Sequence, residues 1–322
     1  MNDSILSIGE HFGGTPCILS LDGKALTFVE TLPPYSMRFK FSDPNYNPLV
    51  AYPIGPSVIY DPAYWKAGCS WTQISADPNI WEYRREPDHF TPEQDPWKAN
   101  AWDAEFMYKF NDYEHNQVEV IGGNTTGITS MNAMLADNPG LVRVALFDTS
   151  AVYDMQQMLL ALRDAQHPED PTAFISHLVE VPNFDFTNCL QTQAMFNGCN
   201  ELETIPAFDL KGVCNANRMF EDCVSLQAIP AMRVDKVGHP MIWEGSVISG
   251  TVLYMDYMFR GCRNVASGIT AMYTALSTNG YDTAAQSAGV TAAQHAQVFE
   301  DCGVDSPSGS AELATVPSSW KE

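Results

Sequence analysis

The sequence predicts an α+β fold in which a small β-rich N-terminal domain precedes a solenoid of repeats. Three observations lead to this prediction. A pattern recurs at regular steps in the second two-thirds of the chain, the first third is rich in aromatic residues, and turn-forming residues are frequent, with 21 glycines and 21 prolines among 322 residues. A chain of this length favours about two domains. We therefore expect a cap or anchor domain at residues 1–115 and the repeats, with a C-terminal cap, at residues 116–322.

The repeat is clearest in two adjacent segments. Met-Phe-x-x-Cys-x-x-Leu-x-x-Ile-Pro begins at residue 195 and again at residue 219. Further copies are centred on Met134, Met158, Met258 and Val298, and they follow one another at this same step or at the same step lengthened by insertions of 13, 15 and 16. The expected repeat core consists of Met195, Cys199, Leu202, Ile205, Met219, Cys223, Leu226 and Ile229.

The spacing within one repeat predicts a short helix followed by a short strand. Met and Cys are four positions apart, so they would share one face of a helix. Leu-x-x-Ile-Pro would then be an extended segment that the proline ends. One such coil cannot bury its apolar side alone, but stacked copies cover one another. The step from Met195 to Met219 also lies within the range of periods that leucine-rich repeats show.

Over residues 117–303, this unit resembles the leucine-rich repeats of BspA-like bacterial surface-antigen proteins. The resemblance is carried by Met195, Cys199 and Ile205 with their counterparts in the next copy, and it weakens where Asn138 replaces the cysteine and Val298 the methionine. The resemblance implies that the chain belongs to one of three groups in which such repeats are found: adhesins of mucosal microbes, related eukaryotic parasite proteins, or virion proteins of phages that infect gut bacteria. The resemblance implies no catalytic residues.

The cysteines mark the repeat. Cys199, Cys223, Cys262 and Cys302 occupy one repeat position, and free cysteine is among the most buried residue types. We expect buried thiols; disulfides between stacked coils and a metal site remain alternatives. Because the sequence has no C-x-x-C or C-x-x-H pair, we expect no metal and no cofactor.

The first 115 residues predict strands at 17–21, 26–30, 37–41, 57–60, 71–74 and 81–85, punctuated by prolines. Their aromatic residues are expected to form a packed core. Alternatively, Trp71, Trp81 and Tyr83 form an exposed platform on which sugar rings stack. At the other end, Trp320 is expected to plug the last coil.

Two neighbouring insertions in the repeats predict an interaction surface. The first is unusually apolar for a loop and includes Met241, Ile242 and Trp243, and the second includes Tyr281. Insertions on one face of a repeat protein often form its binding face. The alternative is that these residues pack within the chain.

Composition and motifs exclude several classes of function. A formal charge of −22 disfavours nucleic acid and anionic membranes as partners, and no apolar run is long enough for a transmembrane helix. The sequence has no G-x-S-x-G, H-E-x-x-H, Walker-type or G-x-G-x-x-G motif. We therefore expect a protein that is not an enzyme.

The start of the chain has neither the positive segment nor the apolar run of a signal peptide. We therefore expect a bacteriophage virion protein of the tail, a fibre or a capsid decoration, assembled in the host cytoplasm. Its expected partners are other virion proteins, further copies of itself, and a host surface receptor or glycan. The alternative is an extracellular or cell-surface bacterial adhesin that binds host protein or glycan.

Overall fold

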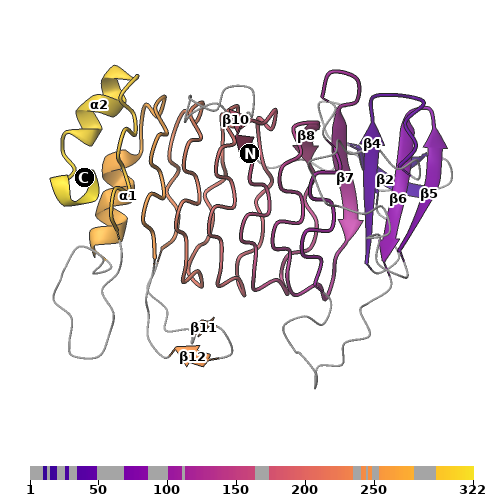
Figure 1. The fold of residues 1–322 in the computed structure, drawn as a ribbon, viewed down its shortest axis with the longest axis horizontal. Coiled ribbons are helices and arrows are strands. Elements are labelled where there is room, and N and C mark those ends of the chain that lie inside the picture. The colour runs from indigo at the N-terminus through magenta and orange to yellow at the C-terminus, as the bar shows by residue number, and fades with distance from the viewer. Residues whose placement is uncertain are drawn as a thin grey trace.

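The computed structural model describes twelve parts of the chain, and Figure 1 shows how they are arranged. The described parts are residues 10–12, 15–19, 26–28, 35–48, 69–85, 101–110, 113–163, 174–234, 241–243, 246–248, 254–278 and 295–322. The five-stranded sheet lies at one end of the molecule, the repeats follow it, and the two short helices lie at the other end (Figure 1).

The regular elements are short. The strands are β1 (Glu10–Phe12), β2 (Thr15–Leu19), β3 (Leu26–Phe28), β4 (Ser36–Phe41), β5 (Cys69–Ala76), β6 (Asn79–Arg85), β7 (Val118–Asn124), β8 (Leu141–Val144), β9 (Leu162–Arg163), β10 (Phe174–Ile175), β11 (Met241–Trp243) and β12 (Ser246–Ile248). The helices are α1 (Ile269–Leu276), α2 (Pro307–Leu313) and the 3-10 helix η3 (Ser318–Trp320).

The main sheet has the strand order β5-β6-β4-β7-β8. All its pairs are antiparallel except β7–β8, which is parallel. Met37, Phe39 and Phe41 alternate along β4 and are almost completely buried, as expected for residues that share one face of a strand. On β4 the intervening Arg38 forms a buried ion pair with Glu82 of β6 at 2.9 Å.

The strands expected at 37–41, 71–74 and 81–85 lie within β4, β5 and β6, and those expected at 17–21 and 26–30 overlap β2 and β3. The strand expected at 57–60 lies outside the described residues. The sheet continues past residue 116, because β7 and β8 belong to it. Strand β4, in the predicted N-terminal domain, is therefore hydrogen-bonded through its main chain to β7, which lies in the segment assigned to the repeats.

The predicted fold class, an α+β leucine-rich-repeat solenoid, is wrong. In the described residues the regular secondary structure is mainly the one mixed five-stranded sheet, with only two short α-helices. Neither helix coincides with the Met-Phe-x-x-Cys segments, which were expected to be helical. The Leu-x-x-Ile-Pro segments do not form strands either, and they contact their neighbours through isolated bridges such as Glu180 to Thr204.

The reason lies in the backbone of the Met-Phe-x-x-Cys segments. Ala194 and Gly198 have φ values of +53° and +75°, and their counterparts Arg218 and Asp222 have +58° and +59°. An α-helix of L-residues requires negative φ throughout. These segments are therefore consecutive turns, and the spacing of Met and Cys reflects a turn geometry that also places both side chains inside.

Equivalent segments nevertheless lie side by side. The amides of Ala194, Phe196 and Gly198 donate to carbonyls of the next copy of the segment, with N···O distances of 2.8–2.9 Å. The amides of Arg218 and Phe220 donate in the same way to the copy that follows. We call these segments the stacked turns. Alternate amides of each turn point to the next one, so every copy is held in register.

One continuous apolar core runs from the sheet to the C-terminal end. Along the stacked turns it contains a ladder of rings in which Phe196, Phe220, Phe259 and Phe299 follow one another with centroids 5.2–5.9 Å apart and planes within 8° of parallel. This ring ladder fixes the positions of consecutive turns relative to one another, so equivalent outer residues of these turns also lie side by side.

Candidate interaction surface

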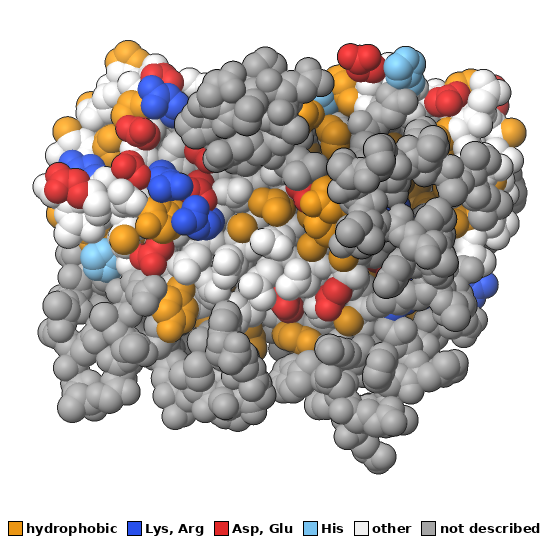
Figure 2. Space-filling model, in the orientation of Figure 1, with side chains coloured by type: hydrophobic (Ala, Val, Ile, Leu, Met, Phe, Trp, Pro, Cys, Tyr) orange, Lys and Arg blue, Asp and Glu red, His pale blue; other side chains and the backbone are white. Residues whose placement is uncertain are grey.

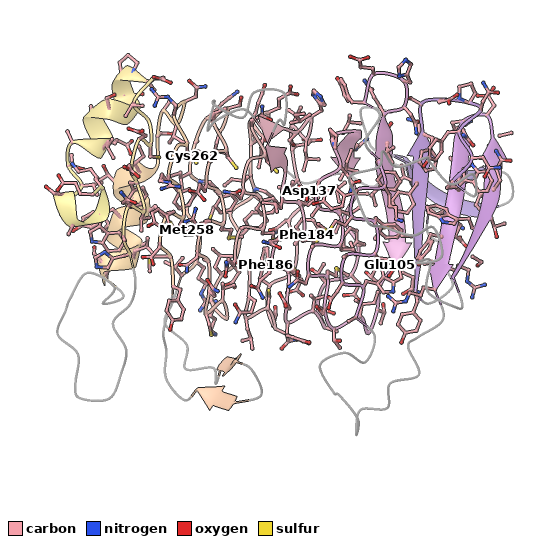
Figure 3. All side chains as sticks on the ribbon, viewed as in Figure 1. Glu105, Asp137, Phe184, Phe186, Met258 and Cys262 are labelled. Atoms are coloured by element: carbon pink, nitrogen blue, oxygen red, sulfur yellow. The ribbon has the colours of Figure 1, made fainter. Side chains whose placement is uncertain are left out.

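The residues expected to form the repeat core are all buried, with exposed fractions between 0 and 9%: Met195, Cys199, Leu202, Ile205, Met219, Cys223, Leu226 and Ile229. The thiols of Cys199, Cys223 and Cys262 donate to main-chain carbonyls of the preceding turn at S···O distances of 3.1–3.2 Å. Figure 3 shows Met258 and Cys262 in one such turn, between the ribbon segments on either side. These positions therefore form the interior of the stack.

Burial also suppresses the chemistry of the thiols. It raises the pKa of the Cys199 thiol to about 12 and the pKa values of Cys223 and Cys262 well above their usual range, chiefly because a thiolate would lose its hydration. The six cysteines whose side chains the structure describes are all free and buried. They are unsuited to nucleophilic catalysis, which requires an accessible thiolate.

The outer face of the stacked turns carries a group that we call the arginine–tyrosine cluster, made of Arg218, Glu221, Tyr257 and Arg260. The guanidinium carbons of Arg218 and Arg260 each lie 4.4 Å from the centroid of the Tyr257 ring. Both arginines also bind the carboxylate of Glu221, whose side chain is only 2% exposed. Asn197 donates a further hydrogen bond to Glu221 at 2.9 Å.

Repeat geometry builds this cluster. Arg218 and Tyr257 occupy the same position in consecutive turns, because the amide of Arg218 donates to the carbonyl of Asp256 at 2.9 Å. Both have the positive φ of that position, +58° and +63°. Asn197, Glu221 and Arg260 likewise share one position in three consecutive turns.

Further ion pairs between consecutive turns extend from the arginine–tyrosine cluster towards the C-terminal end, and we call this row of side chains the charged ladder. Arg260 lies 3.8 Å from Glu300 in the next turn, and Arg263 forms two hydrogen bonds of 2.8 and 3.0 Å with Asp305. Figure 2 shows Lys and Arg side chains among Asp and Glu side chains over this part of the molecule. Opposite charges therefore alternate along the outside of the stacked turns.

The cluster offers fixed donors at a partly exposed surface. The side chains of Arg218 and Arg260 are 42% and 31% exposed, so part of each guanidinium faces solvent. A guanidinium held against an aromatic ring is pre-organised and loses little side-chain freedom when it binds a carboxylate or an aromatic group. Arginine and tyrosine are also the residue types that dominate binding energy in protein interfaces.

Sequence reasoning did not select this cluster. The step from Arg218 to Tyr257 is the same as the step from Met219 to Met258. Applying the repeat alignment to polar positions as well as to apolar ones would have placed the two residues side by side.

The predicted surface in the insertions lies mostly outside the described residues. Met241, Ile242 and Trp243 form strand β11, which pairs with β12 in an antiparallel hairpin. Their side chains lie outside what the structure describes, and so does the whole of Tyr281.

The predicted aromatic platform lies against the core of the five-stranded sheet. Tyr83 is fully buried and Trp81 is 6% exposed, so neither presents a free ring face to a sugar. Trp71 is partly buried, with its ring centroid 5.4 Å from that of Phe39 and 5.1 Å from that of Tyr83. The hydroxyl of Tyr83 donates to the buried carboxylate of Glu105.

Glu105 lies where the sheet meets the first turns (Figure 3) and binds Arg85 at 2.6 Å. Within the described ranges, no three histidine, cysteine or acidic side chains converge to hold a metal ion. None of the helices in these same ranges has both the length and the apolar character required to cross a membrane.

Comparison with known proteins gives one match. The family described as "Mycoplasma protein of unknown function, DUF285" matches residues 104–232, which is less than half of the chain. This type of domain is found in BspA-like surface proteins. No curated protein and no solved structure matches the chain. The chain thus contains a segment similar to this family, and that segment covers most of the stacked turns.

Proposed function

We propose that this chain is a non-enzymatic binding or assembly protein of the BspA-like type, and that it acts in a bacteriophage virion as a tail, fibre or capsid-decoration protein. The observation that carries the proposal is the register of the stacked turns. Equivalent residues such as Glu221 and Arg260, which are far apart in the sequence, come together on the outer face from consecutive turns. Such a surface suits recognition of another macromolecule rather than the enclosure of a small substrate.

The chemistry of the cluster supports a protein partner. Arginines 4.4 Å from a tyrosine ring and bound to a buried carboxylate form a rigid group that can anchor an interface. The proposed partners are other virion proteins and further copies of the chain, with a receptor or glycan on the host surface as the target. No nucleic acid and no membrane insertion form part of the proposal.

The cysteines support assembly in a reducing compartment. Six thiols lie buried and unpaired in the described residues, and free cysteines suit proteins that fold in a cytoplasm. A virion protein folds in the host cytoplasm before release, so its thiols stay reduced during assembly.

A second candidate is a bacterial surface or secreted adhesin that binds host protein or glycan. The match of residues 104–232 to a domain type found in BspA-like surface proteins favours it. The two candidates share the outer face of the stacked turns as the binding surface and differ in where the protein is located.

Mass spectrometry of purified phage particles and of the host envelope separates the two candidates. The proposal expects peptides of this chain in particles purified through a density gradient, at a constant ratio to the major capsid protein. Peptides confined to the host envelope would refute the virion assignment and support the adhesin. If a particle or host partner still binds after Arg218→Ala and Arg260→Ala, the cluster does not belong to the binding surface.

A further inference from the structure

A row of polar side chains runs along the stacked turns, with one member from each of six consecutive turns. We call it the polar row, and its members are Asp103, Asn132, Gln156, Gln193, Asn217 and Asp256. In each of the first five turns, the amide of the residue after the row member donates to the main-chain carbonyl of the next row member, with N···O distances of 2.7–2.9 Å. The six positions are therefore in register.

The polar row faces solvent. The residues that come directly before three of its members, Met131, Met155 and Met255, are fully buried, so the chain turns outwards at the row. The side chain of Asp103 is exposed, and the other five members are partly exposed. Adjacent members are about 4.8 Å apart along the main chain, which is the usual spacing of chains joined by main-chain hydrogen bonds.

Hydrogen bonds hold members of the polar row in place. The side-chain oxygen of Asn217 accepts from the amide of Asp256 at 2.8 Å, and the side-chain oxygen of Gln193 accepts from Nδ2 of Asn215 at 3.1 Å. Asp256 in turn accepts from the amide of Ala296 at 2.6 Å. These side chains are thus pre-organised, and ordering them costs little when a ligand binds.

The same side chains each keep a second polar group for a ligand. Among the described residues, Nδ2 of Asn217, Nε2 of Gln193 and Oδ2 of Asp256 have no hydrogen-bond partner. An amide NH₂ group is a donor, and a carboxylate oxygen is an acceptor. The polar row therefore presents donors and acceptors side by side at its surface.

From these features we infer that the polar row binds a linear, neutral oligosaccharide, whose sugar rings lie across consecutive turns. The inference rests on the proposed function, in which a receptor or glycan on the host surface is the target, and it assigns the glycan to named residues. A sugar hydroxyl both donates and accepts hydrogen bonds, so it matches a row of mixed donors and acceptors. The turns are stacked along the long axis of the molecule (Figure 1), which suits an extended ligand.

Charge and composition favour this ligand over others. Two of the six members are carboxylates and the chain carries a formal charge of −22, which disfavours nucleic acid and acidic glycans. None of the large apolar side chains that stand exposed in the described residues belongs to the row, whereas tryptophan, tyrosine and arginine usually anchor protein interfaces. The arginine–tyrosine cluster, in which Arg218 follows Asn217, has that character and stays assigned to a protein partner.

A carbohydrate array followed by isothermal titration calorimetry tests this inference on the purified full chain. The probes are linear oligomers of glucose, mannose and N-acetylglucosamine, from the disaccharide to the hexasaccharide, together with sialylated and uronic-acid oligosaccharides. At least one neutral series should bind. Its affinity should rise as the oligomer lengthens, because a longer chain engages more turns.

Gln193→Glu combined with Asn217→Asp gives the sharpest comparison. Both substitutions keep the oxygens that hold these side chains in place and replace only the free NH₂ groups. The dissociation constant should rise at least about tenfold, equivalent to about 1.4 kcal/mol. The control, Asn183→Asp combined with Gln227→Glu, makes the same two changes at exposed positions outside the row and should bind as the parent chain does.

Circular dichroism and the melting temperature establish that the variants are folded, and Gln193→Glu alone replaces the double variant if that variant does not fold. Absence of binding to every neutral series overturns the inference, including where only acidic glycans bind. Unchanged affinity in the folded row variant, or affinity that does not rise with oligomer length, overturns it as well. None of these measurements depends on whether the chain is found in virions, so the inference can fail while the virion assignment stands.

Discussion

The indole of Trp320 closes the ring ladder by packing on Phe299, with centroids 6.3 Å apart and planes 27° from parallel. The main chain joins the same two residues, because the amide of Phe299 donates to the carbonyl of Trp320 at 3.0 Å. The imidazole of His295 also stacks on the indole, with centroids 4.4 Å apart. Trp320 therefore covers the last turn as a further turn would, and it forms the C-terminal plug that the sequence predicted.

Replacing Trp320 with alanine should destabilise the protein by about 3–5 kcal/mol, because a fully buried aromatic side chain is lost and the last ring of the ladder is uncovered. Urea unfolding followed by circular dichroism measures this change. Ser319→Ala, at the exposed neighbouring residue, should change the stability by less than about 0.5 kcal/mol. Equal effects of the two substitutions would show that Trp320 does not act as a plug.

Asn138 stands at the position where other turns have cysteine. Its side-chain amide makes the hydrogen bond that the cysteine thiol makes in those turns. Its side chain donates to the carbonyl of Phe106 at 2.9 Å, where Cys223 donates to Phe196 and Cys262 to Phe220. It also donates to the carbonyls of Leu135 and Ala136 within its own turn, and its side-chain oxygen accepts from the amide of Phe110.

Asn138→Ala should therefore cost about 3 kcal/mol or more, because each buried polar group left without a partner costs about 1–3 kcal/mol. Asn138→Cys restores the residue found at the equivalent positions and should cost clearly less. Chemical denaturation of both variants gives the comparison. If cysteine destabilises as much as alanine, then Asn138 is not equivalent to the thiols.

The apolar register of the molecule could be predicted from the sequence, whereas its local conformation could not. The repeating pattern placed Met195 with Met219 and Cys199 with Cys223, and all four are buried. The spacing of Met and Cys also fits a helix, and nothing in the residue types indicated that Arg218 and its counterparts would take positive φ. Non-glycine residues rarely do so, and here the main-chain hydrogen bonds to the next turn hold them there.

The arginine–tyrosine cluster was missed for a different reason, because the repeat alignment was applied to apolar positions alone. The insertion at residues 241–243 drew attention because apolar loop residues stand out in a sequence. Arg218 and Glu221 look like ordinary surface residues until the stacking brings Tyr257 and Arg260 beside them. The step from Arg218 to Tyr257 is the repeat step lengthened by an insertion. The two residues are therefore matched only when polar positions are aligned across that insertion.

The raised pKa of the buried Asp137 carboxyl group predicts that the free energy of unfolding falls as the pH rises. Burial raises the pKa of its carboxyl group to about 6, although a hydrogen bond with Tyr108 opposes the shift. Below the unfolded pKa of about 4 the group is protonated in both states and costs nothing. Between about pH 4 and pH 6 the unfolded chain releases its proton first, so the free energy of unfolding falls, by about 2–3 kcal/mol in total.

Asp137→Asn should remove this component. The difference in unfolding free energy between the variant and the parent chain, measured by urea titration from pH 4 to pH 8, should favour the variant increasingly up to about pH 7. A difference that stays constant over this range would show that Asp137 does not titrate with a raised pKa.

The buried thiols should resist alkylation in the folded protein. Burial raises the pKa values of Cys199, Cys223 and Cys262, and only the thiolate reacts at a useful rate. Iodoacetamide at pH 8, followed by peptide mass spectrometry, should leave these three residues unmodified in the native state and modify all three in urea. Rapid modification without denaturant would show that the stacked turns open readily.

Glu221 should contribute more to stability than the other acidic residues of the charged ladder. Its side chain is 2% exposed and accepts hydrogen bonds from Arg218, Arg260 and Asn197, and hydrogen bonds to charged groups contribute about 1.5–3 kcal/mol each. Because both arginines are partly exposed, water compensates part of the loss when the carboxylate is removed. We expect Glu221→Gln to cost about 1–3 kcal/mol in urea unfolding.

Glu300 provides the matched control for Glu221. It is 35% exposed and lies 3.8 Å from Arg260, so Glu300→Gln should cost less than about 1 kcal/mol, as exposed ion pairs usually do. A double-mutant cycle that combines Glu221→Gln with Arg218→Gln isolates the coupling between those two side chains. A coupling energy near zero would mean that burial of Glu221, and not its pairing with Arg218, determines the cost. A coupling above about 1 kcal/mol would show that the cluster behaves as one unit, as a rigid binding surface requires.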